Sequence, residues 1–267
     1  MKKTKILGIS AFYHDSAVAL IEDGKIVYAS QEERFSRIKH DSKFPKLALK
    51  NLLDFTKTEM KHIDYIIFFG KPFLKFERLL ETYLDFAPRG ILQFLSAMPI
   101  WLKQKLYMKR EISIELKKID PAFNENKLFF SEHHLSHAAS AFFPSPFKRS
   151  IIFSADGVGE WSTTSVAIGE MNTIKIQKEI NFPHSLGLLY SAFTYYIGFK
   201  VNSGEYKLMG LAPYGKPIYK DIIEKNLIDI KSDGSFRLNQ KYFDYSTGFK
   251  MVNRKFNNLF KKPVRKP

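Results

Sequence analysis

The order of apolar and polar positions predicts strands at the start of this chain. Residues 5–31 contain one apolar run and two alternating runs, separated by a polar turn around His14 and by an Asp-Gly turn at 23–24. Alternation with a period of two is typical of half-buried strands, and Asp-Gly between two such runs is a hairpin signal. We therefore expect an antiparallel meander of three strands.

The pattern then changes to a helical period and back. An amphipathic helix is expected at 45–56, a buried strand at 65–69, and a long, mostly helical insertion rich in aromatic and basic residues at 73–119. A short strand at 127–130 then returns the chain to the sheet. These elements alternate in the way that α/β domains require.

The centre of the chain, 131–165, predicts one helix followed by one strand. Its first part has a helical period and ends at two prolines, and the apolar run 150–155 then has the length of a buried strand. Alternating runs at 163–169 and 173–180 predict a second hairpin. The repeated order of strand, loop with aspartate, hairpin and helix suggests two related halves.

Together these elements predict an α/β fold. We expect residues 1–217 to form one domain part, in which 5–217 build a mixed sheet with helices on its faces, the meander at one side and the helical insertion at 73–119. Residues 218–267 are expected to continue the same domain and to end in a basic, mobile tail.

Composition narrows the class of protein. The chain has 267 residues with a hydrophobic share of 45%, enough for a real core, and 42 Lys plus Arg against 27 Asp plus Glu. The formal charge of +15 is spread along the sequence, which is a weak argument for nucleic acid. No cysteine is present, so disulfides and thiolate metal sites are excluded.

No segment predicts a membrane span or a secretion signal. The most apolar window, 90–102, contains Pro99 and is shorter than the about 20 residues that a spanning helix needs. It could lie on a membrane surface, but packing against a partner domain explains the same pattern better. Met1 is followed by lysines and a strand, not by an apolar signal segment, so we expect a cytoplasmic protein.

Two histidines and one aspartate form the clearest candidate site. His133 and His137 are four residues apart, so on a helix both imidazoles leave one face, whereas His134 points elsewhere. With Asp156 at the end of a predicted strand, two nitrogens and a carboxylate suit zinc or ferrous iron. Taken alone, such a histidine pair is more often two ordinary helix residues, and the DGVGE turn at 156–160 is more often a hairpin than a phosphate-binding loop.

Several segments carry a family resemblance. GISAFYHDSAVAL, QEERFSRIKHD, HHLSHAASAFFPSPF, DGVGE, HSLGLLYSAFTYYIGF and GEYKLMGLAPYGKP follow one another over about residues 5–217. In this order and spacing they resemble the O-carbamoyltransferase family of nodulation-factor and antibiotic biosynthesis. The first domain of that family is similar to actin-like ATPases and to the tRNA threonylcarbamoyl-transfer proteins, so the resemblance implies an actin-like (ribonuclease H-like) fold.

The resemblance also implies a reaction. In that family a YrdC-like domain converts ATP and carbamoyl phosphate to carbamoyl adenylate, and the first domain moves the carbamoyl group to a hydroxyl of a small-molecule or sugar acceptor. The rest of the actin-like fold and the YrdC-like domain would follow Pro267, so this chain resembles only the front part of the enzyme. A separate C-terminal, YrdC-like half is therefore an expected partner.

The matched residues acquire roles from the resemblance. His133, His137 and Asp156 become ligands of an iron ion, Fe2+, completed by a carboxylate from a later segment. The glycine-rich stretch 204–215 is expected to be a binding loop near the nucleotide rather than a helix throughout. The residues expected to contact the nucleotide or acyl phosphate are Asp156, Gly157, Gly159, Glu205 and Lys207.

The transfer step needs a base and a positive charge. A hydroxyl loses its proton only far above neutral pH, so attack on a carbamoyl carbon needs a base, and histidine is the side chain most easily poised for that task. His14, in the loop after the first strand, is the candidate. Lys39 is expected to add a point charge to the same phosphate or carbonyl oxygens.

Other functions fit parts of the pattern. A sugar kinase of the same superfamily would not need the histidine helix, and an inactive fragment or partner subunit of a split carbamoyltransferase would not need a complete site. No residue reveals the acceptor alcohol. The insertion at 73–119 is where we expect acceptor or partner specificity, because insertions vary while a sheet is constrained.

Overall fold

The structure of the protein is a computed structural model that describes residues 3–103 and 105–266. It divides into two compact units, Met1–Pro72 with Ile100–Ser136 and Phe73–Pro99 with His137–Pro267. The domain boundary expected at residue 217 stays a prediction. Across the described residues, no helix combines the length and the apolar character that crossing a membrane would need.

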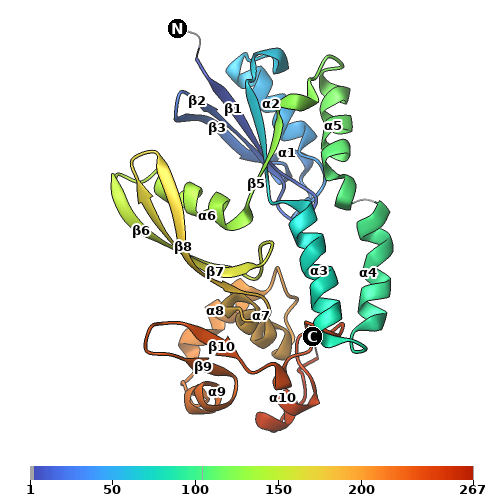
Figure 1. The fold of residues 1–267 in the computed structure, drawn as a ribbon, viewed down its shortest axis with the longest axis vertical. Helices are drawn as coiled ribbons and strands as arrows, with labels where there is room; N and C mark the ends of the chain where they lie inside the picture. Colours follow the sequence, from blue (N-terminus) through green and yellow to red (C-terminus); the bar gives the residue numbers. More distant parts are fainter. Residues whose placement is uncertain (1–2, 104, 267) are drawn as a thin grey trace. The chain divides into compact units, whose positions relative to one another are not determined.

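A five-stranded mixed sheet forms the first unit (Figure 1). The sheet has the order β3-β2-β1-β4-β5, with β1–β2 and β2–β3 antiparallel and β1–β4 and β4–β5 parallel. The expected meander and the two following strands are thus confirmed. The strands are β1 (Lys5–Ser10), β2 (Ala17–Glu22), β3 (Lys25–Gln31), β4 (Tyr65–Phe69) and β5 (Leu128–Ser131).

Alternating strand residues and two helices build the core of this unit. Leu7 of β1, Leu20 of β2 and Ile66 of β4 are almost fully buried and share one apolar cluster with Leu49 and Ile112 of the helices. Each such side chain stabilises the fold by about 1.5–3 kcal/mol. These two helices are α2 (Lys46–Thr56) and α5 (Met108–Ile119). The unit also contains α1 (Glu33–Ser36) and the short turns η1 (Met60–His62), η2 (Lys105–Tyr107) and η3 (Glu125–Lys127).

The strands of the second unit lie in sheets of their own. A three-stranded antiparallel sheet has the order β6-β7-β8, and β9 and β10 form a separate pair. The expectation of one sheet across residues 5–217 is therefore wrong, although the α/β class with flanking helices is confirmed. The strands are β6 (Arg149–Ala155), β7 (Ser162–Glu170), β8 (Thr173–Asn181), β9 (Ile228–Ile230) and β10 (Phe236–Leu238).

Strand β6 is covered on one face only. Ile152 is 5% exposed and packs with Ala138 and Phe142, whereas Ile151 and Phe153 are 75% and 63% exposed. The expectation of a fully buried strand at 150–155 is thus wrong. The reason is that α6 (His133–Phe142) packs on the face that carries Ile152, and a continuous apolar run does not reveal which face a helix covers.

The helical insertion is confirmed and consists of α3 (Pro72–Phe86), α4 (Ile91–Lys103), η2 and α5.

The glycine-rich residues 204–215 are mostly helical, which differs from the loop expected there. They form α8 (Glu205–Leu211) and the turn η4 (Ala212–Tyr214). Gly204 and Gly215 flank these helical turns. The remaining helices are α6 (His133–Phe142), α7 (Leu186–Tyr196), α9 (Lys220–Asn226), η5 (Gln240–Tyr242) and α10 (Arg254–Leu259).

The basic C-terminal segment is packed, which differs from the mobile tail expected there. Phe256 of α10 is fully buried, and its ring meets Phe193 of α7 edge to face at 5.4 Å. The Arg265 N–H donates to the carbonyl of Tyr196 at 2.9 Å. The many basic residues of this segment led to the expectation of a mobile tail. The segment is packed because its aromatic side chains each bury a large apolar surface.

Replacing this anchor should cost stability. Phe256→Ala removes a fully buried ring from the apolar cluster of the second unit, so we expect the free energy of unfolding to fall by about 3–5 kcal/mol. Urea unfolding followed by circular dichroism measures this. Phe249→Ala, at a position 72% exposed, is the matched control and should change stability little. Equal effects of both substitutions would contradict the packing described here.

Candidate functional site

Helix α6 presents both predicted histidine ligands. His133 and His137 are its first and fifth residues, so their side chains lie on one face about one turn apart. His134 is only 4% exposed and leaves the helix in another direction, as expected. Pro144, just beyond the end of the helix, agrees with the predicted stop.

Packing on the second sheet fixes the C-terminal part of α6. Ala138 is fully buried beside His137, and the ring of Phe142 lies directly on Gly169 of β7. A Cβ atom at Gly169 would be 2.6 Å from that ring, so the contact requires glycine. These contacts therefore fix the distance between the C-terminal part of α6 and strands β6 and β7.

His137 faces Asp156, the residue that follows β6. Their Nε2 and Oδ2 atoms are 3.7 Å apart. The nearby carboxylate of Asp156 raises the pKa of His137 above its ordinary value, and partial burial of the imidazole opposes this effect. The structure thus brings together two of the three predicted ligands within the second unit, and α6 carries the third, His133.

The DGVGE turn is the hairpin between β6 and β7. The Gly157 N–H donates to the carboxylate of Asp156 at 2.6 Å, and the Gly159 N–H donates to the carbonyl of Ser162 at 2.9 Å. Both glycine amides are therefore used inside the chain. This geometry favours the hairpin interpretation over a phosphate-binding loop, and the nucleotide contacts expected for Gly157 and Gly159 stay predictions.

Helix α7 supports this turn from the other side. The hydroxyl of Ser185, the N-cap residue, lies 2.7 Å from the Gly157 carbonyl and 3.0 Å from the Asp156 carbonyl, and it accepts the Leu188 N–H at 2.9 Å. Gly187 lets the helix approach, because a Cβ atom there would be 2.5 Å from the Asp156 carbonyl oxygen. Asp156 is thus held by backbone contacts.

His14 belongs to a polar network in the first unit. Its Nδ1 is 2.9 Å from Oδ2 of Asp15, and Nδ1 of His40 is 2.9 Å from Oδ1 of the same carboxylate. The His40 N–H donates to Glu33 at 3.0 Å. Burial raises the pKa of Asp15, but hydrogen bonds from His40 and His14 together outweigh it, so that pKa lies below its usual value.

Two loops are tied together to form this network. The Phe12 N–H donates to the carbonyl of Ser42 at 2.7 Å, and the Ser16 N–H donates to the carbonyl of Asp41 at 2.9 Å. Half-buried Lys105 donates to the Phe12 carbonyl at 2.8 Å, and burial lowers its pKa. These bonds hold the first loop against the loop after α1.

Sequence reasoning missed Asp15 and His40. Both residues have left-handed backbone conformations, with φ of 48° and 57°, which is uncommon outside glycine. Lys39, the other predicted catalytic residue, is exposed on the same loop as His40. The repeated His-Asp pairs at 14–15 and 40–41 were the signal in the sequence that could have found these residues.

The same network has a donor set that can attract a cation. One ligand atom each of Asp15, Glu33 and His40 lies within 4.8 Å of the others.

Glu205 and Lys207, the predicted nucleotide contacts of the second unit, lie on α8. The Glu205 carboxylate accepts the Ser191 hydroxyl at 2.9 Å and the Asn202 N–H at 3.0 Å, so it joins α8 to α7. Burial raises its pKa, but these and the other hydrogen bonds lower it overall. Lys207 lies over the ring of Phe199, with its ammonium 5.9 Å from the centroid. Their roles toward a nucleotide stay predictions.

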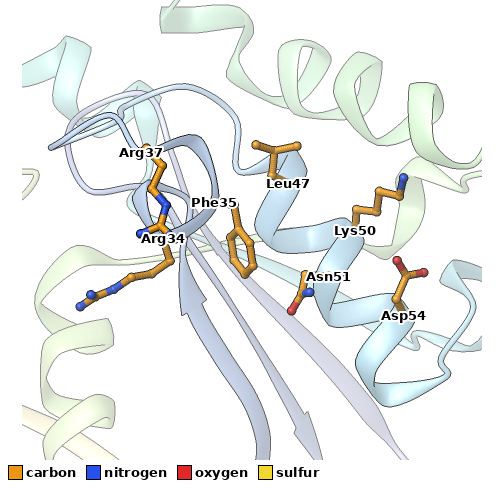
Figure 2. A pocket seen from close by; sticks show the side chains of 7 residues that line it. All are labelled: Arg34, Phe35, Arg37, Leu47, Lys50, Asn51 and Asp54. Atoms are coloured by element: carbon orange, nitrogen blue, oxygen red, sulfur yellow. The ribbon is translucent and has the colours of Figure 1, made fainter.

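The surface of the first unit also has a shallow hollow of about 400 Å³ (Figure 2). Arg34 and Arg37 approach it from the segment around α1, and Lys50 and Asp54 approach it from α2. Its described lining includes none of the predicted site residues. The hollow is wide open to solvent, so we assign it no role.

Comparison with known proteins identifies the family. Residues 5–266 match the model of the family described as Carbamoyltransferase N-terminus. The chain therefore belongs to this family, and the resemblance seen in the sequence motifs is confirmed.

Two relatives illustrate how much of a longer protein the chain covers. It is 58% identical over 266 residues to the uncharacterized protein sll1178 of Synechocystis sp., covering 99% of this chain and 43% of that protein. It is 32% identical over 231 residues to the nodulation protein NolNO of Sinorhizobium fredii, covering 86% of this chain and 32% of that protein. The chain thus spans less than half the length of these relatives.

Among solved structures, an Aquifex aeolicus member of the Ppx/GppA protein family is similar at 12% identity and a TM-score of 0.31. That comparison covers 85% of this chain and 65% of the other. Such a slight likeness carries no argument about function.

The Asp15 network makes acid sensitivity testable. A carboxylate whose pKa is lowered by folding stabilises the fold above its unfolded pKa of about 3.8, and this contribution is lost as the pH falls through the folded value. Because the group is partly exposed, we expect Asp15→Asn to reduce the free energy of unfolding by less than about 1 kcal/mol at pH 7, with the difference shrinking toward pH 3.

Urea unfolding at several pH values measures this difference. Asp85→Asn, at an exposed carboxylate of α3, is the control and should change the free energy of unfolding little. A constant difference for Asp15→Asn would show that the two histidines do not stabilise the charged carboxylate.

Proposed function

We propose that this chain provides the carbamoyl-transferring part of an O-carbamoyltransferase, which moves a carbamoyl group from carbamoyl adenylate to a hydroxyl of a small-molecule or sugar acceptor. The observation that carries the proposal is the family match over residues 5–266. Because the chain covers 43% of the Synechocystis relative, we assign formation of the adenylate from ATP and carbamoyl phosphate to a YrdC-like part outside these residues.

His133, His137 and Asp156 are the proposed metal ligands. Two neutral imidazoles and one carboxylate are a donor set that suits ferrous iron or zinc, and they leave coordination positions for substrate. Two observations support the proposal: the four-residue spacing on α6, and the 3.7 Å distance between His137 Nε2 and Asp156 Oδ2. A cation bound there would supply a Lewis acid that stabilises negative charge on carbonyl or phosphate oxygens.

His14 is the proposed general base. In the transfer, the acceptor oxygen bonds to the carbamoyl carbon, the bond from that carbon to the phosphate oxygen of the adenylate breaks, AMP leaves, and the hydroxyl proton passes to His14. Asp15 supports this role, because a carboxylate bonded to one ring nitrogen orients the imidazole. With Nδ1 held by Asp15, Nε2 is the nitrogen left to accept the proton.

Lys39, Glu205 and Lys207 have supporting roles in the proposal. Exposed Lys39 would neutralise phosphate or carbonyl oxygens as a point charge. Glu205 would accept hydrogen bonds from ribose hydroxyls in addition to those it already accepts, and Lys207 would contact the acyl phosphate. No observation favours the sugar kinase over this assignment, and the histidine helix is a feature that a kinase would not need.

Turnover in a reconstituted system tests the proposal. The chain mixed with a separately produced YrdC-like part, ATP, carbamoyl phosphate and a panel of sugars and simple alcohols should release AMP and yield a carbamoylated alcohol, detected by mass spectrometry. His14→Ala should lower kcat about 100-fold to 10,000-fold, as loss of a general base does. His62→Ala, at an exposed histidine, should leave kcat unchanged.

The chain without the YrdC-like part should consume neither ATP nor carbamoyl phosphate. Turnover by the isolated chain, or an unchanged kcat in the His14→Ala variant, would contradict the proposed division of roles.

A further inference from the structure

We propose that a pocket in the second unit is the acceptor subsite, and that it takes an acceptor with a planar or apolar body and an anionic substituent. This inference rests on the proposed function and adds the chemical class of the acceptor. The pocket has a volume of about 300 Å³, at the lower end of the range of small-molecule sites. Helices α3 and α4, the DGVGE turn, α7 and the segment around Tyr245 all contribute to its lining.

The walls of the pocket are mainly apolar. Tyr83 of α3 and Phe94 of α4 stack with their ring centroids 4.3 Å apart and an angle of 15° between the planes. Leu79, Ala97 and Val158 complete much of the apolar lining. Flat aromatic surface next to small aliphatic groups favours a ring or another compact apolar body, because it removes apolar area from water without leaving polar groups unpaired.

Polar contacts hold the walls in place before any ligand binds. Arg78 of α3 donates to the carbonyl of Gly159 at 3.0 Å, and its guanidinium lies 5.5 Å from the ring centroid of Phe182. Gln93 of α4 donates to the carbonyl of Gly248 at 2.7 Å. The two helices are thus bonded to the turn and to the C-terminal segment, so a ligand need not order them.

Gly90 and Tyr245 fix the position of α4 and of the segment around Tyr245 in the wall of the pocket. Gly90 has a φ of +82°, and a Cβ atom there would be 3.2 Å from the Cα of Thr247, so the start of α4 approaches that segment closely. The Tyr245 hydroxyl donates to the carbonyl of Pro183 at 2.7 Å. Burial raises the pKa of Tyr245, so the phenol stays neutral and keeps this bond at all physiological pH values.

The charge of the lining selects the substituent. Among the described residues that line the pocket, two are arginines and none is acidic. Arg78 is already bonded to the turn, whereas Arg89 is exposed. A guanidinium in this position offers a planar pair of donors that matches a carboxylate or a phosphate oxygen pair.

The pocket shares the DGVGE turn with Asp156, a proposed metal ligand of the second unit. Val158 lines it, and Asp156 is only two residues earlier in the same turn, so their Cα atoms are within about 7 Å. In this proposal, an acceptor whose body occupies the pocket extends its hydroxyl toward the turn that carries Asp156. The DGVGE turn therefore connects the pocket wall formed by the helical insertion to Asp156, near which the acceptor hydroxyl would receive the carbamoyl group.

Probe binding to the purified chain tests the proposal. The probe is 4-(hydroxymethyl)benzoate, which combines a ring, a primary hydroxyl and a carboxylate, and the matched probe is benzyl alcohol, which lacks the carboxylate. Binding is followed by NMR of methyl groups, with those of Ala97, Val158 and Leu188 as reporters. We expect both probes to shift these three signals, and the benzoate to bind more tightly.

Two variants separate the contributions. Arg89→Ala, at an exposed position that should not disturb folding, should weaken the benzoate about tenfold and leave benzyl alcohol unchanged, because the variant loses a charge-assisted contact that is partly screened by solvent. Ala97→Phe should fill the pocket and prevent binding of both probes. Arg149→Ala, at an exposed arginine of β6, is the control and should bind both probes like the unaltered chain.

The proposal is overturned if the benzoate shifts none of the three reporter signals at millimolar concentration, or if Arg89→Ala binds both probes unchanged. These experiments need no turnover, so they stand apart from the test of the proposed function. In a separate turnover experiment, if the reconstituted reaction carbamoylates other alcohols but not the bound benzoate, the pocket remains a binding site and its assignment as the acceptor subsite is overturned.

Discussion

The second unit is organised by the close approach of α7 to the turn after β6. Ser185 is fully buried at the start of that helix, and its hydroxyl bonds the backbone of the turn while it caps the helix. Gly187 makes the approach possible, since any side chain there would meet the backbone at Asp156 and Gly157. A carboxylate and one wall of a pocket are consequently placed by the same few backbone contacts.

This approach connects the proposed chemistry to the insertion. The turn carries Asp156 toward His137 on one side and Val158 toward the pocket on the other. Arg78 bonds the same turn to α3. If the pocket is the acceptor subsite, as proposed, a change in the insertion alters acceptor binding through the turn without touching the residues proposed to bind the metal. In the first unit, a single side chain orients two histidines: Asp15 uses one carboxylate oxygen for His14 and the other for His40.

The sequence predicted the elements well where hydrophobic periodicity is strong. The meander, the amphipathic helix at 45–56 and the histidine helix follow from patterns of two and of about 3.6 residues, and the structure contains them. The period does not say which sheet a strand joins or which of its faces is covered, so the single sheet and the buried β6 were wrong. At 204–215, helix formation prevails because Gly210 is tolerated inside α8 and the other two glycines lie at the ends of the helical turns.

The candidate site was predictable only in part. Spacing on one helix identified His133 and His137, because the period fixes their common face. Asp15 and His40 are 25 residues apart and meet through two loops in left-handed conformations, which no local pattern encodes. Glu205 was assigned to a ligand, yet its carboxylate already accepts hydrogen bonds that join α8 to α7, and only tertiary contacts reveal this.

Metal binding depends, in this proposal, on α7 holding Asp156 where it can share an ion with the histidines of α6. Titration calorimetry with ferrous ion under anaerobic conditions, applied to Gly187→Ala and Gly210→Ala, measures this dependence. An added Cβ at 187 must displace the turn, whereas one at 210 would have open space around it, with no described atom beyond its own helix within 4 Å. We expect Gly187→Ala to lose at least about tenfold in affinity and Gly210→Ala to bind like the unaltered chain. Unchanged affinity in a folded Gly187→Ala variant would show that α7 does not position the metal ligand.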